Sequence, residues 1–119
     1  MPKQTDAVII NTIQVTDEGL EKNFATNTVG TYIITRALLP LLEKSDDPRV
    51  VVVSSGGMLV QKLTLSDLQS GKMSPFDGTM VYAQNKRQQV VMTHKWAEQY
   101  PAVHFASMHP GQFIALGNL

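Results

Sequence analysis

The sequence predicts an α/β fold, a partial Rossmann-like βαβαβ unit in which three parallel strands alternate with two long helices. Short runs rich in β-branched residues predict the strands, near residues 7–10, 50–54 and 103–108. Helical patterns predict the two helices, near residues 17–43 and 79–99. Because strands connected through helices lie parallel with right-handed crossovers, residues 1–119 are expected to form a single partial domain.

The composition limits the classes of function. Ten basic and ten acidic residues give a formal net charge of zero, and without a basic cluster the chain is not expected to bind nucleic acid. The absence of cysteine excludes disulfides, thiol catalysis and cysteine-bound zinc, and no metal site is expected. No apolar run approaches the ~20 residues of a membrane span. These features predict an intracellular, cytoplasmic protein without a membrane span.

The first predicted helix, at 17–43, has one apolar side with steps of four and three residues. We expect this stripe to face inward: Leu20, Phe24, Asn27, Thr31, Ile34, Leu38 and Leu41. Asn27 places an amide on the stripe, which indicates either a core amide satisfied by a neighbouring backbone group or a functional residue. Gly30 follows about one turn later and predicts the close approach of another backbone. Pro40 predicts a kink or a break.

The run Val50–Val53 is apolar on both faces, as expected for a central parallel strand, and Ser54-Ser55-Gly56-Gly57 follows it. Open α/β sheets place their sites at such carboxyl ends, although the same four residues are equally typical of an ordinary turn. The loop at 58–78 is long, and long ordered loops often face a substrate. The helix at 79–99 begins with an almost wholly polar half, which indicates either a solvated surface or a polar cleft.

Tyr82 and Lys86 are four residues apart, so that on a helix they point the same way. An ammonium held near a phenol favours the phenolate and lowers a Tyr pKa from its reference value near ~10. Such a pair can transfer a proton to or from a substrate beside it. The spacing alone is not specific, because chance gives roughly 0.2 such pairs in a chain of this composition.

Four motifs, in their order along the chain, resemble those of the short-chain dehydrogenase/reductase family. They are Asn27-Thr-Val-Gly30, Val51-Val-Val-Ser-Ser55, Tyr82-Ala-Gln-Asn-Lys86 and His109-Pro-Gly111. Each motif alone has little specificity, but the four together are highly specific. The resemblance covers residues 17–111.

The resemblance implies a role for each of these residues. Tyr82 would be the general acid/base, Lys86 would lower the Tyr82 pKa, and Ser55, rather than Ser54, would bind the substrate oxygen. Asn27 would hold a water in a proton relay. The implied cofactor is NAD or NADP, and its implied contacts are Tyr82, Lys86, Pro110 and Gly111. The implied substrate is a small-molecule carbonyl or alcohol.

The sequence departs from the family pattern at several points. Family members begin with a strand, a glycine-rich TGxxxGxG turn and a helix that together hold the cofactor pyrophosphate, and no such turn occurs here. The Asn-Asn-Ala-Gly strand end and the threonine after the Pro-Gly turn are also missing, and the length is about half that of a complete member. We therefore expect a truncated form with little or no activity alone and without saturable NAD(P) binding of its own.

Two other interpretations stay open. The chain could be a non-catalytic fragment or isoform that associates with a partner chain, for example as a dimer through the two long helices that the family often uses for dimer contacts. It could also fail to fold stably, because an unpaired edge of the first strand favours aggregation. Cofactor binding separates the enzyme from the fragment, and a cooperative unfolding transition would exclude the unstable chain.

Overall fold

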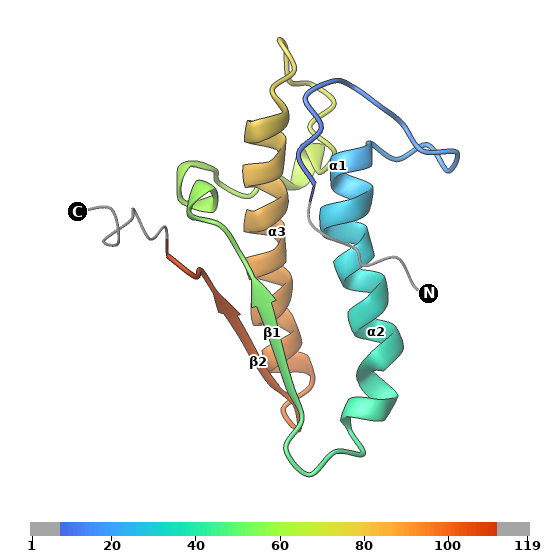
Figure 1. The fold of residues 1–119 in the computed structure, drawn as a ribbon, viewed down its shortest axis with the longest axis vertical. Helices are drawn as coiled ribbons and strands as arrows, with labels where there is room; N and C mark the ends of the chain where they lie inside the picture. The colour runs from blue at the N-terminus through green and yellow to red at the C-terminus, as the bar shows by residue number, and fades with distance from the viewer. Residues whose placement is uncertain (1–7, 112–119) are drawn as a thin grey trace, which may run out of the picture.

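The computed structural model describes residues 8–111, which form two helical rods packed on a two-stranded parallel sheet (Figure 1). Strand β1 is Arg49–Val53 and strand β2 is His104–Met108, with Val50 opposite Phe105 in the parallel register. The α/β class, the two helices and the parallel pairing of the two later strands are confirmed. The prediction of three strands is not, because the sheet among the described residues contains only β1 and β2.

The segment predicted as the first strand does not pair with β1, and its backbone is instead hydrogen-bonded to two asparagine side chains. The first residue of that prediction, Ala7, lies outside the described residues. Asn27 accepts from the Val8 N–H at 2.9 Å and donates to the Val8 carbonyl at 2.8 Å. Asn23 forms the same pair with Ile10, at 2.7 and 2.9 Å. Two residues of extended chain rise about 6.6 Å, which is close to the rise of about 5.4 Å for one helical turn. Asn23 and Asn27, about one turn apart on the helix, can therefore bond Ile10 and Val8, which are two residues apart in the extended segment. The backbone groups of Val8 and Ile10 are therefore already satisfied by side chains.

The first helical rod starts later than predicted. It consists of α1 (Lys22–Phe24), the π-helical turn η1 (Ala25–Val29) and α2 (Gly30–Leu42). The carboxylate of Glu21 sets the start, since it accepts from the backbone N–H groups of Asn23 at 3.0 Å and Phe24 at 2.8 Å. Pro40 lies inside α2, which ends two residues later.

The apolar stripe of this rod is buried only in its first part, where Phe24 and Asn27 lie. Its last three members are 51%, 44% and 64% exposed: Ile34, Leu38 and Leu41. The buried residues of α2 are Thr35 and Leu39 instead. The expected inward face is therefore uncovered toward the end of α2.

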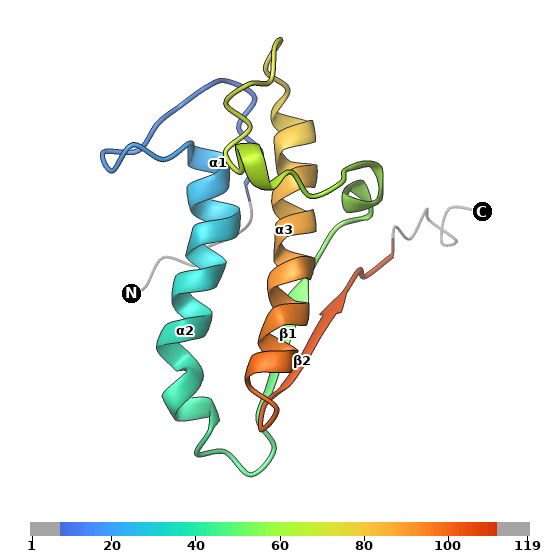
Figure 2. The same ribbon diagram turned by 180° about the vertical axis from the view of Figure 1, so that it is seen from behind.

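The second rod is α3, Gly78–Gln99, capped by the Asp77 carboxylate, which accepts from Thr79 N–H at 3.0 Å and Met80 N–H at 3.2 Å. Its carboxyl-terminal half forms the main core with the sheet and α2. The buried members of this core are Leu39, Trp96, Val103 and Phe105. Figure 2 shows both rods on one face of the sheet, and Figure 1 shows no helix over the opposite face.

The long connection between β1 and α3 contains two short 3-10 helices, η2 (Gly56–Val60) and η3 (Leu65–Asp67). It folds over the amino-terminal half of α3, where Gln84 donates to the Lys62 carbonyl at 2.7 Å and Arg87 to the Gln61 carbonyl at 2.9 Å. Within residues 8–111, neither rod is long and apolar enough to cross a lipid bilayer.

Candidate active site

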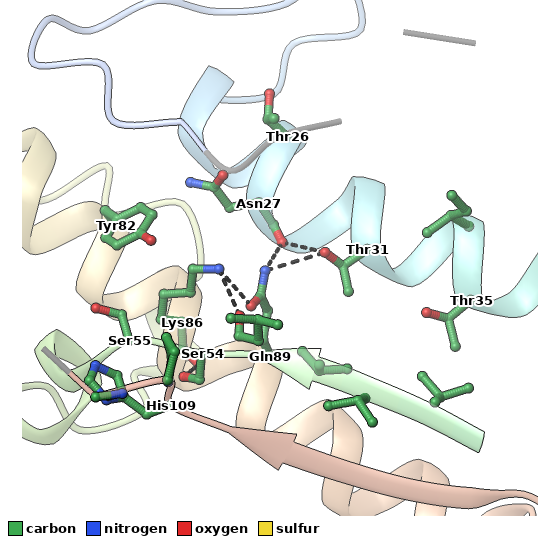
Figure 3. A pocket seen from close by; sticks show the side chains of 17 residues that line it. Thr26, Asn27, Thr31, Thr35, Ser54, Ser55, Tyr82, Lys86, Gln89 and His109 are labelled. Atoms are coloured by element: carbon green, nitrogen blue, oxygen red, sulfur yellow. Dashed lines mark hydrogen bonds between the residues drawn. The ribbon is translucent and has the colours of Figure 1, made fainter. Parts of the chain in front are cut away.

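An open cavity of about 690 Å³ lies between the η1–α2 rod, β1 and the amino-terminal half of α3. All six residues predicted to form the site line it: Asn27, Ser55, Tyr82, Lys86, Pro110 and Gly111. In Figure 3, Tyr82, Ser55, Lys86 and His109 gather at one end, and Asn27 and Thr31 lie across from Lys86 on the first rod. The fold thus brings side chains from three separate elements to the carboxyl end of β1.

Lys86 is buried, with 5% of its surface exposed. Its Nζ donates to the Val53 carbonyl at 3.0 Å and to Gln89 Oε1 at 3.2 Å. An ammonium has three N–H donors, so one remains for a ligand in the cavity. Burial lowers the pKa of Lys86, because the charged form loses hydration.

Tyr82 is half-buried beside Lys86, whose Nζ lies 5.4 Å from the centre of the phenol ring. Burial raises the pKa of Tyr82. This differs from the lowering expected from the Tyr-Lys spacing. The ammonium lies over the ring and is held by Val53 and Gln89, and the cause of the raised Tyr82 pKa is the desolvation of the phenolate by burial.

The two serines after β1 have different environments. Ser54 is buried and its hydroxyl donates to the backbone carbonyl of Lys86 at 3.3 Å. Ser55 is half-buried and caps η2, where its Oγ accepts from the Gly57 N–H at 3.2 Å. Accepting this bond leaves the Ser55 hydroxyl proton available to a ligand, whereas that of Ser54 is used inside the fold.

The side-chain amide and the backbone carbonyl of Asn27 have protein partners. Its side chain bonds both backbone groups of Val8 and donates to Asn85 Oδ1 at 3.1 Å. Its backbone carbonyl accepts from Gln89 Nε2 at 2.5 Å and from the Thr31 hydroxyl at 2.8 Å. The side chain is therefore satisfied as a core amide, one of the two alternatives that the sequence left open, and its role in a proton relay stays a prediction.

The polar half of α3 faces inward, so that the cleft is favoured over the solvated surface. Its buried polar residues are 0–5% exposed: Gln84, Asn85, Lys86, Gln88 and Gln89. Gln88, for example, accepts from the Thr28 hydroxyl at 2.5 Å and donates to the Leu68 carbonyl at 2.9 Å. No buried polar side-chain atom within residues 8–111 lacks a hydrogen-bond partner.

Sequence reasoning missed Gln89 and His109 as site residues. Gln89 follows Lys86 by three positions, so that the spacing of neighbours on one helix face was a usable signal. His109 lines the cavity next to the predicted Pro110-Gly111 turn, and its Nδ1 accepts from the Gly111 N–H at 3.0 Å. Gly111 has φ +75°, a conformation that favours glycine.

Two groups in the cavity could bind hydroxyl groups of a ligand: the remaining Lys86 donor and the Tyr82 hydroxyl. No glycine-rich turn for the pyrophosphate occurs in the sequence. Within residues 8–111, no group of three or more His, Asp or Glu side chains is placed to hold a metal ion.

No protein-family model matches the chain. The chain is 66% identical over 103 residues to human dehydrogenase/reductase SDR family member 12, and the match covers 87% of the chain and 32% of that protein. The chain belongs to the short-chain dehydrogenase/reductase family. Mouse retinol dehydrogenase 12 is 32% identical over 102 residues, covering 84% of the chain and 32% of the relative. Human polyprenol dehydrogenase is 36% identical over 83 residues, covering 66% and 24%.

These matches confirm the resemblance found in the sequence. The chain spans a third or less of the length of these curated relatives, a smaller share than the half of a complete family member that we expected from its length. A crystal structure of an uncharacterized protein from Mycobacterium paratuberculosis shares the fold, with a TM-score of 0.75 and 25% identity over 90% of the chain and 40% of that protein. Membership implies NAD or NADP as cofactor and small-molecule substrates for the family.

Proposed function

We propose that this chain carries the acid/base half of an NAD(P)-dependent oxidoreductase acting on a carbonyl or alcohol, and that alone it has little or no activity. The observation that carries the proposal is the shared cavity of Tyr82, Ser55 and Lys86. Each of these side chains has a hydrogen-bond donor that the described protein groups do not use. Donors converging on one space are what the reduction of a carbonyl requires.

The proposed chemistry gives each side chain one task. In the reducing direction Tyr82 transfers its hydroxyl proton to the substrate oxygen, and Ser55 donates a hydrogen bond to the same oxygen as negative charge develops there. The cofactor, when bound, supplies the hydride that the carbonyl carbon accepts. Lys86 directs its third N–H at the ribose and, as a cation beside Tyr82, favours the phenolate left after proton transfer. In the oxidising direction the phenolate takes the alcohol proton.

The proposal of low activity for the isolated chain rests on positioning. Holding reactants in the right geometry accounts for roughly 7–11 kcal/mol of a barrier in favourable cases. The cavity offers contacts for the nicotinamide ribose, but the sequence contains no TGxxxGxG turn to hold the pyrophosphate. Only a small share of the cofactor contacts of a complete family member would therefore form.

The names of two relatives support the substrate class. One is named for retinol and the other for polyprenol, both alcohols. These names describe those proteins, and the proposal takes from them only the reacting group, an alcohol or the carbonyl derived from it.

Two measurements test this proposal. Titration of the purified 119-residue chain with NADH or NADPH should show no saturable binding at millimolar cofactor. Joining a complete glycine-rich amino-terminal half of a family member to Asp17 should yield turnover, and Tyr82→Phe in that graft should abolish it. A micromolar dissociation constant for the short chain would show that the positioning argument is wrong, and full activity of the Tyr82→Phe graft would remove Tyr82 from the mechanism.

A second function, association with a partner chain, is favoured by the surface of α2. Ile34, Leu38 and Leu41 are 51%, 44% and 64% exposed on one side of this helix, an apolar surface that a partner helix would cover. We propose self-association of the chain through α2. Sedimentation should show a dimer that Leu38→Lys with Leu41→Lys dissociates, while Gln99→Lys on the exposed side of α3 does not. A monomer at all concentrations would exclude it.

A further inference from the structure

The amide of Gln89 connects the candidate acid/base pair to the first helical rod. Its Oε1 accepts from Lys86 Nζ at 3.2 Å, and its Nε2 donates to the Asn27 carbonyl at 2.5 Å and to the Thr31 hydroxyl at 3.3 Å. Gln89 is 4% exposed and lines the cavity. Figure 3 shows the amide between the Lys86 ammonium and the first rod.

The surroundings of Lys86 make this neutral contact important. Among the described residues, the cavity lining contains no carboxylate, and its other titratable side chains are Tyr82, on the same helix, and His109, after β2. The acceptors of the ammonium among the described residues are the Val53 carbonyl and the Gln89 amide oxygen. Gln89 therefore supplies one of the two contacts that the described residues provide to a buried charge, and no counter-ion stands among the lining residues in the part of the chain that the structure describes.

We infer that Gln89 is a positioning residue for Lys86. The oxygen of its amide holds the ammonium between β1 and η1, and the nitrogen of the same amide donates a hydrogen bond to the Asn27 carbonyl. The inference rests on the proposed function and adds to it a residue that does not touch the substrate. An amide satisfies both contacts, because its oxygen accepts from the ammonium while its nitrogen donates to the carbonyl, whereas an ionised carboxylate has no donor for that carbonyl.

The two contacts predict opposite effects for two substitutions. In Gln89→Leu the ammonium loses an acceptor that favours its charged form, so that the pKa of Lys86 should fall. In Gln89→Glu a carboxylate replaces the amide oxygen at hydrogen-bond distance, so that the same pKa should rise by about one unit or more. A side chain that only fills space would give no such reversal of sign.

The test is an NMR titration of the Lys86 side chain in the full 119-residue chain, with its resonance identified by its loss in Lys86→Arg. Gln88→Leu is the matched control. Gln88 is the preceding residue, is 3% exposed and bonds Thr28 and Leu68, whereas the Lys86 ammonium bonds Val53 and Gln89. Gln88→Leu should leave the Lys86 titration unchanged. Gln89→Asn, with a shorter amide, gives a second variant should the leucine variant not fold, and it too should lower the pKa.

Shifts of opposite sign for Leu or Asn and for Glu, absent in Gln88→Leu, support the inference. Shifts of one sign for all Gln89 variants, no shift, or an equal shift in Gln88→Leu would each overturn it. The titration requires neither cofactor nor turnover. An inactive graft would therefore count against the proposed function without affecting this result, and an unshifted titration would count against Gln89 without affecting the proposed function.

Discussion

The Lys86 ammonium lies 3.0 Å from the carbonyl oxygen of Val53, the last residue of β1. This contact joins α3 to the carboxyl end of the strand and holds a cation in a buried position. It replaces part of the hydration that the ammonium loses, but not all of it, because burial still lowers the pKa of Lys86. The lowered pKa links the candidate site to the stability of the fold.

The first prediction concerns pH. The unfolded chain keeps the Lys86 proton up to a pKa near 10.5, whereas the folded chain releases it at lower pH. Between these two values the unfolded state binds more protons, so the Lys86 contribution to the free energy of unfolding rises with pH and is lost as pH falls through the folded pKa. Lys86→Met should remove this rise, measured by urea unfolding from about pH 7 to pH 10.

Lys44→Met, at an exposed position, is the control for this prediction and should keep the wild-type pH dependence. Above pH 10.0 the raised pKa of Tyr82 acts in the opposite direction, because the unfolded phenol ionises first and stability then falls with rising pH. Identical pH profiles for wild type and Lys86→Met would show that the ammonium is not desolvated in the folded chain.

The second prediction tests the asparagine pairs that hold residues 8–10. Asn27→Leu should lower the free energy of unfolding by about 1–3 kcal/mol, because the buried backbone groups of Val8 lose their partners. Hydrogen exchange should show faster exchange of the Val8 amide. Asn23→Leu should instead release Ile10. Gln14→Leu, at an exposed site, should do neither, and protection of Val8 that survived Asn27→Leu would contradict the pairing.

These asparagines also mark the limit of what the sequence could predict about the fold. A β-branched run such as 50–53 predicts a strand, and its parallel partner at 104–108 followed from the intervening helix. The run at 7–10 has the same local character. Local pattern does not reveal which groups satisfy a backbone, and here the partners of Val8 and Ile10 are amides 19 and 13 residues away.

The candidate site was more predictable in its membership than in its contacts. The resemblance to the family motifs placed Tyr82, Lys86 and Ser55 in one group, and these three line one cavity. The orientation of the Lys86 ammonium toward Val53 and Gln89 was not predictable, because it depends on acceptors from β1 and from the next turn of α3. The Tyr82 pKa was expected to be lowered, and burial in the folded chain raises it instead.

The third prediction separates the two serines. Ser54→Ala removes the bond to the Lys86 carbonyl and Ser55→Ala removes the cap of η2, so each should destabilise the chain by about 1 kcal/mol. In the catalytically complete graft only Ser55→Ala should lower turnover strongly, by about 10²–10³-fold, because it removes a donor to the substrate oxygen. A larger loss of turnover in Ser54→Ala would exchange the roles of the two residues.

The last prediction compares two glycines. Gly30 was expected to meet another backbone, but a Cβ there would contact only the Ala25 carbonyl of its own rod, at 3.5 Å. Gly30→Ala should therefore gain up to about 1 kcal/mol from helix propensity. At Gly78 a Cβ would collide with the Ile10 carbonyl and lie 2.8 Å from the Asn11 Cα, both backbone atoms that cannot rotate away.

Gly78→Ala should accordingly lower the free energy of unfolding by about 1–3 kcal/mol, since Ile10 and Asn11 must move away from the new methyl group. The movement would also break the bond from the Gly78 N–H to Asn11 Oδ1, now 2.8 Å. Urea unfolding of both variants measures the two effects, with Gly30→Ala as the matched control for helix propensity. If Gly78→Ala stabilised the chain as Gly30→Ala does, residues 10–11 could not lie against the start of α3.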